Sequence, residues 1–96
     1  MEASPEAYTP GLAMSLSNLA NILSGLGRSG EALEAAEEAA GLYRVLVEAS
    51  PEAYTPGLAA SLNNLAKILS GLGRSGEALE AAEEAAGLYR VLVEAS

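Results

Sequence analysis

The chain has 96 residues and a net charge of −8, and it contains neither cysteine nor histidine. Its acidic residues are all Glu, and they outnumber Lys and Arg by thirteen to five. This balance argues against nucleic acid as a partner, because that binding depends on cationic contacts to phosphates, and against an anionic membrane surface. Half of the residues are hydrophobic, mostly Ala and Leu, which predicts one small helical domain with closely packed backbones.

The first eight residues, MEASPEAY, are acidic and lack the apolar stretch of a signal peptide. No apolar run approaches the roughly 20 residues of a membrane span. We therefore expect residues 1–8 to be a short lead-in and the protein to be cytoplasmic.

Residues 4–49 recur as residues 50–95 with three differences, Met14/Ala60, Ser17/Asn63 and Asn21/Lys67. A copied unit that contains two helical stretches is typical of a solenoid, in which neighbouring units bury each other's apolar faces. We expect two repeats, 4–49 and 50–95, within a single domain spanning 1–96.

The first helix of each repeat is predicted at 10–26 and 56–72. Thr9 can cap its free amides, and Pro10 at the first helical position loses no needed hydrogen bond. Gly27 is free to adopt the left-handed conformation that ends a helix. Leucines recur at steps of three and four and predict one packing stripe: Leu12, Leu16, Leu19, Leu23 and Leu26.

The second helix of each repeat is predicted at 30–48 and 76–94, after a turn at Arg28-Ser29-Gly30. Its expected inward face holds Ala32, Ala35, Ala36, Ala39, Tyr43 and Leu46, and its outward face holds Glu34, Glu37, Gly41, Arg44 and Glu48. Ser50-Pro51 either ends this helix or starts the next one with a new cap. Tyr54 is expected to pack beneath the helix ends at this joint.

The unit resembles the tetratricopeptide repeat. The slots of that repeat are filled here by Leu16, Leu19-Ala20, Leu23, Gly27, Ala32, Ala36 and Ala39, and by Leu62, Leu65-Ala66, Leu69, Gly73, Ala78, Ala82 and Ala85. The string LNNLA at 62–66 is most similar to the long-repeat variety found in kinesin light chains and bacterial signalling proteins. Arg44 stands where the family usually has Pro, so the second helix is longer and the repeat exceeds the usual length of about 34 residues.

The resemblance implies an all-α fold of four helices, in which antiparallel helix–turn–helix pairs stack as a short right-handed α-solenoid. It also implies a non-enzymatic interaction scaffold whose concave groove, lined by the first helix of each repeat, receives an extended peptide or protein segment. The residues in the groove positions are Met14, Ser17, Asn18, Asn21, Ser24, Ala60, Asn63, Asn64, Lys67 and Ser70.

All three differences between the copies fall on this face, within about 60° of each other and nearly opposite the leucine stripe. One interpretation is that a duplicated scaffold carries different groove residues. The other is that exposed positions drift because nothing constrains them. The exposed positions of the second helix are identical in both copies, which favours the groove.

Catalytic chemistry has little support in the sequence. Without His, Cys or Asp, the chain has no Ser–His–Asp set, no Cys–His pair and no zinc site, and we expect no cofactor. The neighbouring pairs Glu37-Glu38 and Glu83-Glu84 diverge by about 100° on a helix, which makes them weak candidates for paired acid–base work.

A competing interpretation is a minimal repeat protein, engineered or excised, that folds and self-associates without a ligand. The two ends of a repeat stack are complementary, so copies are expected to associate head to tail, or to exchange a helix pair through the joint at 50–55. The expected partners are thus a peptide or protein segment and further copies of the chain.

Overall fold

A computed structural model describes residues 5–96 as four helices of 21 residues each. They are α1 (Pro5–Gly25), α2 (Ser29–Ala49), α3 (Pro51–Gly71) and α4 (Ser75–Ala95). No strand occurs among the described residues. The prediction of an all-α protein built from two helix–turn–helix repeats is confirmed.

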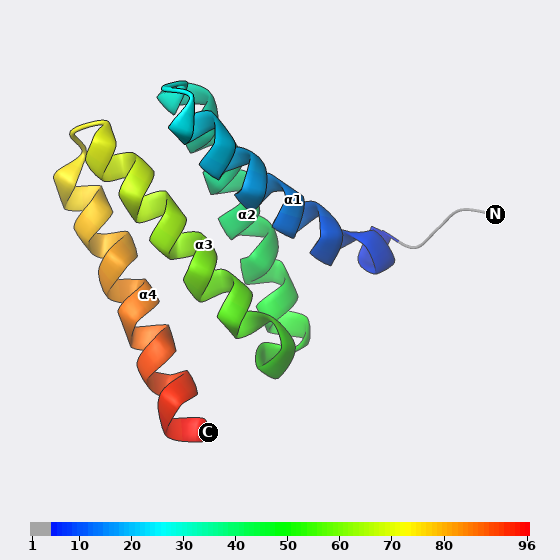
Figure 1. Ribbon diagram of the computed structural model, residues 1–96. Coiled ribbons are helices and arrows are strands. Elements are labelled where there is room, and N and C mark those ends of the chain that lie inside the picture. The colour runs from blue at the N-terminus through cyan, green and yellow to red at the C-terminus, as the bar shows by residue number, and fades with distance from the viewer. Residues whose placement is uncertain (1–4) are drawn as a thin grey trace.

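The helices form a flat stack measuring 42 × 38 × 16 Å (Figure 1). Each helix packs against its neighbours in the sequence, and α1 also touches α3. Within residues 5–96, α1 and α4 do not touch each other and lie at opposite ends of the stack (Figure 1). The stack therefore has two free ends, one formed by α1 and one by α4.

The predicted helix start at Pro10 is wrong, and so is its copy at Pro56. Both prolines lie inside helices that begin at Pro5 and Pro51, so only residues 1–4 of the predicted lead-in fall outside the described chain. Proline is well suited to the first helical position, and the Pro5 and Pro51 starts override the signal five residues later. An internal proline removes one hydrogen bond and crowds the preceding turn, yet both helices continue through it.

Ser50 resolves the alternatives at the joint, because it is the single non-helical residue between α2 and α3. Its carbonyl accepts a hydrogen bond from the Tyr54 amide at 3.2 Å, which closes the first turn of α3. Tyr54 is half-buried against the core, as expected of a residue packing beneath the joint.

The turns within the repeats end as the sequence predicts. Gly27 has a φ of 78° and its copy Gly73 a φ of 79°. The Arg28 amide donates to the Leu23 carbonyl at 2.9 Å and the Gly27 amide to the Ser24 carbonyl at 3.1 Å. This pair of bonds satisfies the carbonyls that the helix end leaves unpaired.

The core consists of two clusters that join the repeats. The first contains Ala13, Ala40, Tyr43, Leu46, Leu58, Leu62 and Ala85, and the second contains Ala20, Leu23, Ala32, Ala35, Ala36 and Ile68. Every residue predicted for the inward face of the second helix is buried in α2, and every residue predicted for its outward face is exposed. Small alanines on α2 let α3 approach it closely.

The predicted leucine stripe behaves differently in the two copies. Leu58 of α3 is 5% exposed, whereas its copy Leu12 in α1 is 48% exposed. Leu19 of α1 and Leu26 in the turn after it are also exposed, so the stripe is only partly a packing face there. The reason is positional: α3 packs against α2, while no described element covers the same side of α1.

Candidate functional site

The ten predicted groove residues all lie outside the buried core. Eight of them are exposed, and the other two, Ser17 and Asn64, are half-buried. Because none of these side chains is buried, the polar groups of the set remain accessible. All ten residues are therefore accessible from the surface of the molecule.

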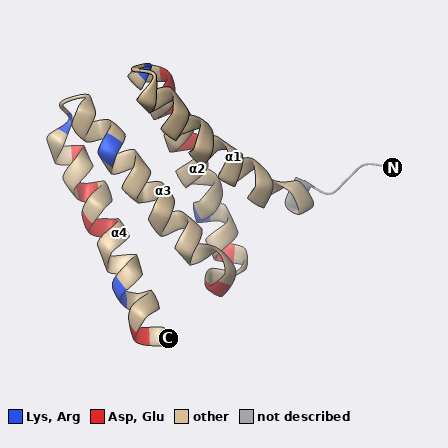
Figure 2. Ribbon diagram, in the orientation of Figure 1, with Lys and Arg blue, Asp and Glu red and all other residues tan. Residues whose placement is uncertain are grey.

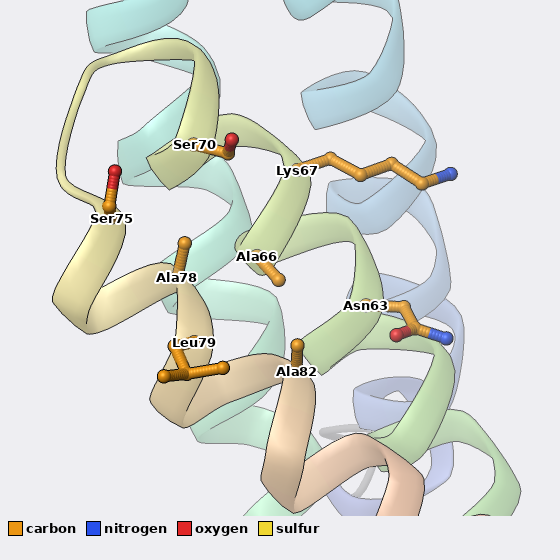
Figure 3. A pocket seen from close by; sticks show the side chains of 8 residues that line it. All are labelled: Asn63, Ala66, Lys67, Ser70, Ser75, Ala78, Leu79 and Ala82. Carbon is orange, nitrogen blue, oxygen red and sulfur yellow. The ribbon is translucent and has the colours of Figure 1, made fainter.

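Three of the predicted residues meet at one open hollow of about 580 Å³ between α3 and α4. Asn63, Lys67 and Ser70 contribute to its α3 wall together with Ala66, and the α4 wall consists of Ser75, Ala78, Leu79 and Ala82. Figure 3 shows Asn63 and Lys67 at the rim, with the Lys67 side chain extending away from α4. The hollow is therefore mainly apolar along α4 and mainly polar along α3.

Sequence reasoning missed the α4 wall of this hollow. The corresponding positions in the first repeat include Ala32 and Ala36, which cluster with Ile68 of the next repeat. In the second repeat no described helix packs on the other side of α4, and Ala78 and Ala82 line the open hollow instead of surrounding an isoleucine. This wall could have been predicted from the sequence, because the inward face of the second helix is repeated in both copies.

One ion pair crosses between the repeats on their acidic side. The Arg44 guanidinium donates to the Glu84 carboxylate at 2.8 and 3.0 Å, which ties α2 to α4. The hydrogen bond from Arg44 holds the pKa of Glu84 below its ordinary value, although burial opposes this shift. Figure 2 shows that acidic residues line α2 and α4, while α3 carries little charge along its length.

Two further ion pairs stabilise the turns. Arg28 contacts Glu31 at 2.6 and 2.7 Å, and Arg74 repeats this contact with Glu77 at the same distances. These hydrogen bonds lower the carboxyl pKa of Glu31 and Glu77. Both pairs are exposed and local, and Lys67 is the cation that lines the hollow.

Residues 5–96 hold no group of three or more acidic, cysteine or histidine side chains placed to bind a metal ion. No helix in the described part of the chain is long and apolar enough to cross a membrane. What the surface offers is amide, hydroxyl and ammonium groups beside exposed apolar side chains.

The decisive comparison is with protein-family models. A model described as tetratricopeptide repeat matches residues 12–52 and again residues 58–96, which together make up most of the chain. The chain belongs to the tetratricopeptide repeat family. Tetratricopeptide repeats generally mediate protein–protein interaction and are not catalytic. No curated protein and no solved structure matches the chain significantly.

The family slots agree with the structure of these tetratricopeptide repeats. Ala20, Ala32, Ala36 and Ala39 are buried, and Gly27 adopts the left-handed conformation at the turn. The small side chains let the two helices of the repeat approach each other, and the glycine lets the chain reverse between them.

Proposed function

We propose that this protein is a non-enzymatic interaction scaffold, and that the exposed face of α1 and α3 receives an extended peptide. The observation that carries the proposal is the position of the differences between the repeats. Met14/Ala60, Ser17/Asn63 and Asn21/Lys67 all lie on this one face, while the exposed outward positions of α2 and α4 are identical. Because the differences between the repeats are confined to one of the two exposed faces, they favour a binding role for that face.

The chemistry of the face suits a peptide backbone. Asn18, Asn21, Asn63 and Asn64 each offer a donor and an acceptor, which match the N–H and C=O groups of an extended segment. Lys67 is the one cation of α3 and is exposed beside the hollow, so a carboxylate of the peptide can pair with it. We therefore expect preferred peptides to carry an acidic residue or a free carboxyl terminus near Lys67.

A displayed peptide library tests this proposal. Peptides selected on the wild-type protein are measured against Lys67→Ala and Asn64→Ala by isothermal titration calorimetry, with Glu80→Ala on the outward side of α4 as the control. Loss of one charged or backbone-directed hydrogen bond is expected to weaken binding by about tenfold, while the control binds like the wild type. Failure to select any peptide, or binding that ignores both changes, contradicts the proposal.

The second candidate function is that of a minimal repeat protein whose ends associate without a ligand. The specific observation in its favour is the exposed apolar side chains at both free ends, which include Leu12 and Ile22 on α1 and Tyr89 and Val93 on α4. Sedimentation equilibrium measures this property directly. A mass that rises with concentration supports it, and a strictly monomeric mass at about 1 mM contradicts it.

We also propose that the repeats are of the long variety found in kinesin light chains. The support is that both repeats pair two helices of 21 residues and are joined by the single residue Ser50. An added third copy of residues 50–95 tests this. The added helix pair is expected to fold and pack against α4, and so to raise the melting temperature. An unfolded third copy contradicts the assignment.

A further inference from the structure

The free face of α4 has an exact structural precedent within the chain, namely the face of α2 on which α3 packs. Resting on the second candidate function above, we infer that a second copy of this chain docks its α1 on α4 in the register of the α2–α3 contact. Three pairs of groups contact each other across the boundary between the repeats and support this docking. The copies of each pair lie at the two ends of the stack and lack this contact.

The first pair is a glycine and a tyrosine. Tyr43 of α2 lies against Gly57 of α3 so closely that a Cβ atom at Gly57 would stand 2.9 Å from the Tyr43 Cδ1 and Cζ atoms. Gly11, the copy of Gly57, has nothing within 4 Å of its Cβ position. Tyr89, the copy of Tyr43, is 38% exposed where Tyr43 is 9% exposed. The tyrosine of α4 and the glycine of α1 are thus both without their partner.

The second pair is an apolar side chain and the hollow that receives it. Ile68 of α3 packs among Ala20, Ala32 and Ala36. The copies of these three alanines, Ala66, Ala78 and Ala82, line the open hollow between α3 and α4. Ile22, the copy of Ile68, is exposed on α1. The hollow is therefore lined by the copies of the alanines that surround Ile68 elsewhere in the same chain.

The third pair is an ion pair. Arg44 donates two hydrogen bonds to Glu84 across the boundary between the repeats. Their copies are Arg90 on α4 and Glu38 on α2, both exposed, and neither takes part in an ion pair within the described chain. Docking in the same register places Arg90 of one copy beside Glu38 of the next and so adds charge complementarity to the apolar contact.

A surface hollow that straddles the boundary shows the same relation. In the second repeat it is lined by Leu62, Leu65, Leu69 and Glu84, and also by Glu37 and Arg44 from the first repeat. In the first repeat the equivalent hollow is lined by Leu16, Leu19, Leu23 and Glu38, with no contribution from a preceding repeat. A docked copy supplies Glu83 and Arg90 at these missing positions.

The contact is heterologous, because the α4 face of one copy meets the α1 face of another. Each added copy leaves the same two ends free, so growth continues and does not stop at a dimer. In the assembly, the polar face of α1 of the next copy lies beyond the polar face of α3 along the stack. The polar faces of successive copies therefore continue along the assembly, while Ile22 of the docked copy occupies the hollow beside Lys67.

Gly11→Ala tests this inference. Sedimentation equilibrium of wild-type and variant chains up to about 1 mM, in about 0.15 M salt, gives the association constant of each. A Cβ atom at position 11 occupies the space that the Tyr89 ring needs, so association is expected to weaken by about tenfold. The matched control is Gly41→Ala, which also places alanine in a helix but at an outward position with nothing within 4 Å. It is expected to associate like the wild type.

The possible outcomes separate the inference from the function on which it rests. A monomer at every concentration overturns both. Association that Gly11→Ala leaves unchanged, or a closed dimer that stops growing as expected for helix exchange at Ser50, overturns the docking register but keeps self-association. Asn64→Ala, at a position outside the lining of the hollow, is expected to associate normally, so loss of peptide binding and loss of docking are told apart.

Discussion

Helices α1 and α3 differ at three positions, yet one buries a face that the other exposes. Leu58, Ser61 and Ile68 of α3 are covered by the preceding repeat, whereas Leu12, Ser15 and Ile22 of α1 are open. Local sequence is the same at these six positions, so the difference arises from the neighbour alone. Burial in a repeat protein is therefore a property of position in the stack, as the quasi-one-dimensional nature of solenoids requires.

The largest expected contrast between the two helices comes from their isoleucines. Ile68 is 4% exposed and Ile22 is 61% exposed. Ile68→Ala is expected to lower the free energy of unfolding by about 2–5 kcal/mol through lost burial and a cavity. Ile22→Ala is expected to change it by less than about 0.5 kcal/mol, since its surface is open. Urea unfolding at low micromolar concentration measures both, and equal effects would refute the comparison.

A matched pair of glycines sharpens the comparison, because replacing each by alanine is expected to change the stability in opposite directions. Gly57→Ala forces the Tyr43 ring to move, and the overpacking of about 1–3 kcal/mol exceeds the gain in helix propensity. Gly11→Ala meets no atom and is expected to stabilise the monomer by about 0.5–1 kcal/mol. Thermal unfolding of dilute samples should move the melting temperature down for the first variant and up for the second. Shifts of the same sign would show that Gly57 is not a constrained position.

A matched pair of serines tests the cost of burial at the repeat boundary. Ser61 is 1% exposed, and its Oγ atom is buried with no hydrogen-bond partner. Ser61→Ala removes this unpaired hydroxyl and is expected to raise the free energy of unfolding by about 1–2 kcal/mol. Ser15→Ala, at the exposed copy, is expected to gain less than about 0.5 kcal/mol from helix propensity. Chemical denaturation of both variants measures the difference, and a destabilised Ser61→Ala would mean that the hydroxyl is satisfied.

The smallest expected effect concerns the ion pair between repeats and depends on pH. The hydrogen bond from Arg44 lowers the pKa of Glu84, so the carboxylate contributes stability above its ordinary pKa of 4.5 and loses it as the pH falls through the lower folded-state value. Glu84→Gln should cost less than about 1 kcal/mol at pH 7, because the pair is partly exposed, and nothing once the carboxylate is protonated in both states.

The control for this measurement is Glu38→Gln, at the copy of Glu84, which removes no ion pair within the described chain. Its stability relative to the wild type is expected to stay constant across the same pH range in dilute solution. A cost at Glu84 that persists at acid pH would assign its role to packing and not to charge.

The sequence predicted the repeats, the glycine turns and the inward face of α2, because these depend on local spacing and on side-chain size. It misplaced the starts of α1 and α3, because Pro10 and Pro56 look like first-turn prolines although Pro5 and Pro51 already hold that position. It also treated the leucine stripe of α1 as packed. Leucine spacing reports an apolar face, but only the neighbours decide whether that face is covered.

The candidate surface was predicted in part for the same reason. Asn63, Lys67 and Ser70 were recognised from the polar face of the helix, and they do line the hollow. Leu79 and Ala82 were not recognised, because in sequence they are indistinguishable from Leu33 and Ala36, which contact the next repeat. A residue at the end of a stack changes from core to surface without any change in its local sequence.

The docking of α1 on α4 of a second copy is the central claim, and exchanging the charges of its ion pair tests it most directly. Arg90→Glu and Glu38→Arg each place like charges together in a head-to-tail contact, and each variant alone is expected to associate about fivefold more weakly than the wild type. In an equimolar mixture, every contact between different variants pairs opposite charges again. Sedimentation equilibrium of the mixture should recover association near the wild-type strength, and a mixture that associates no better than the separate variants would contradict the account.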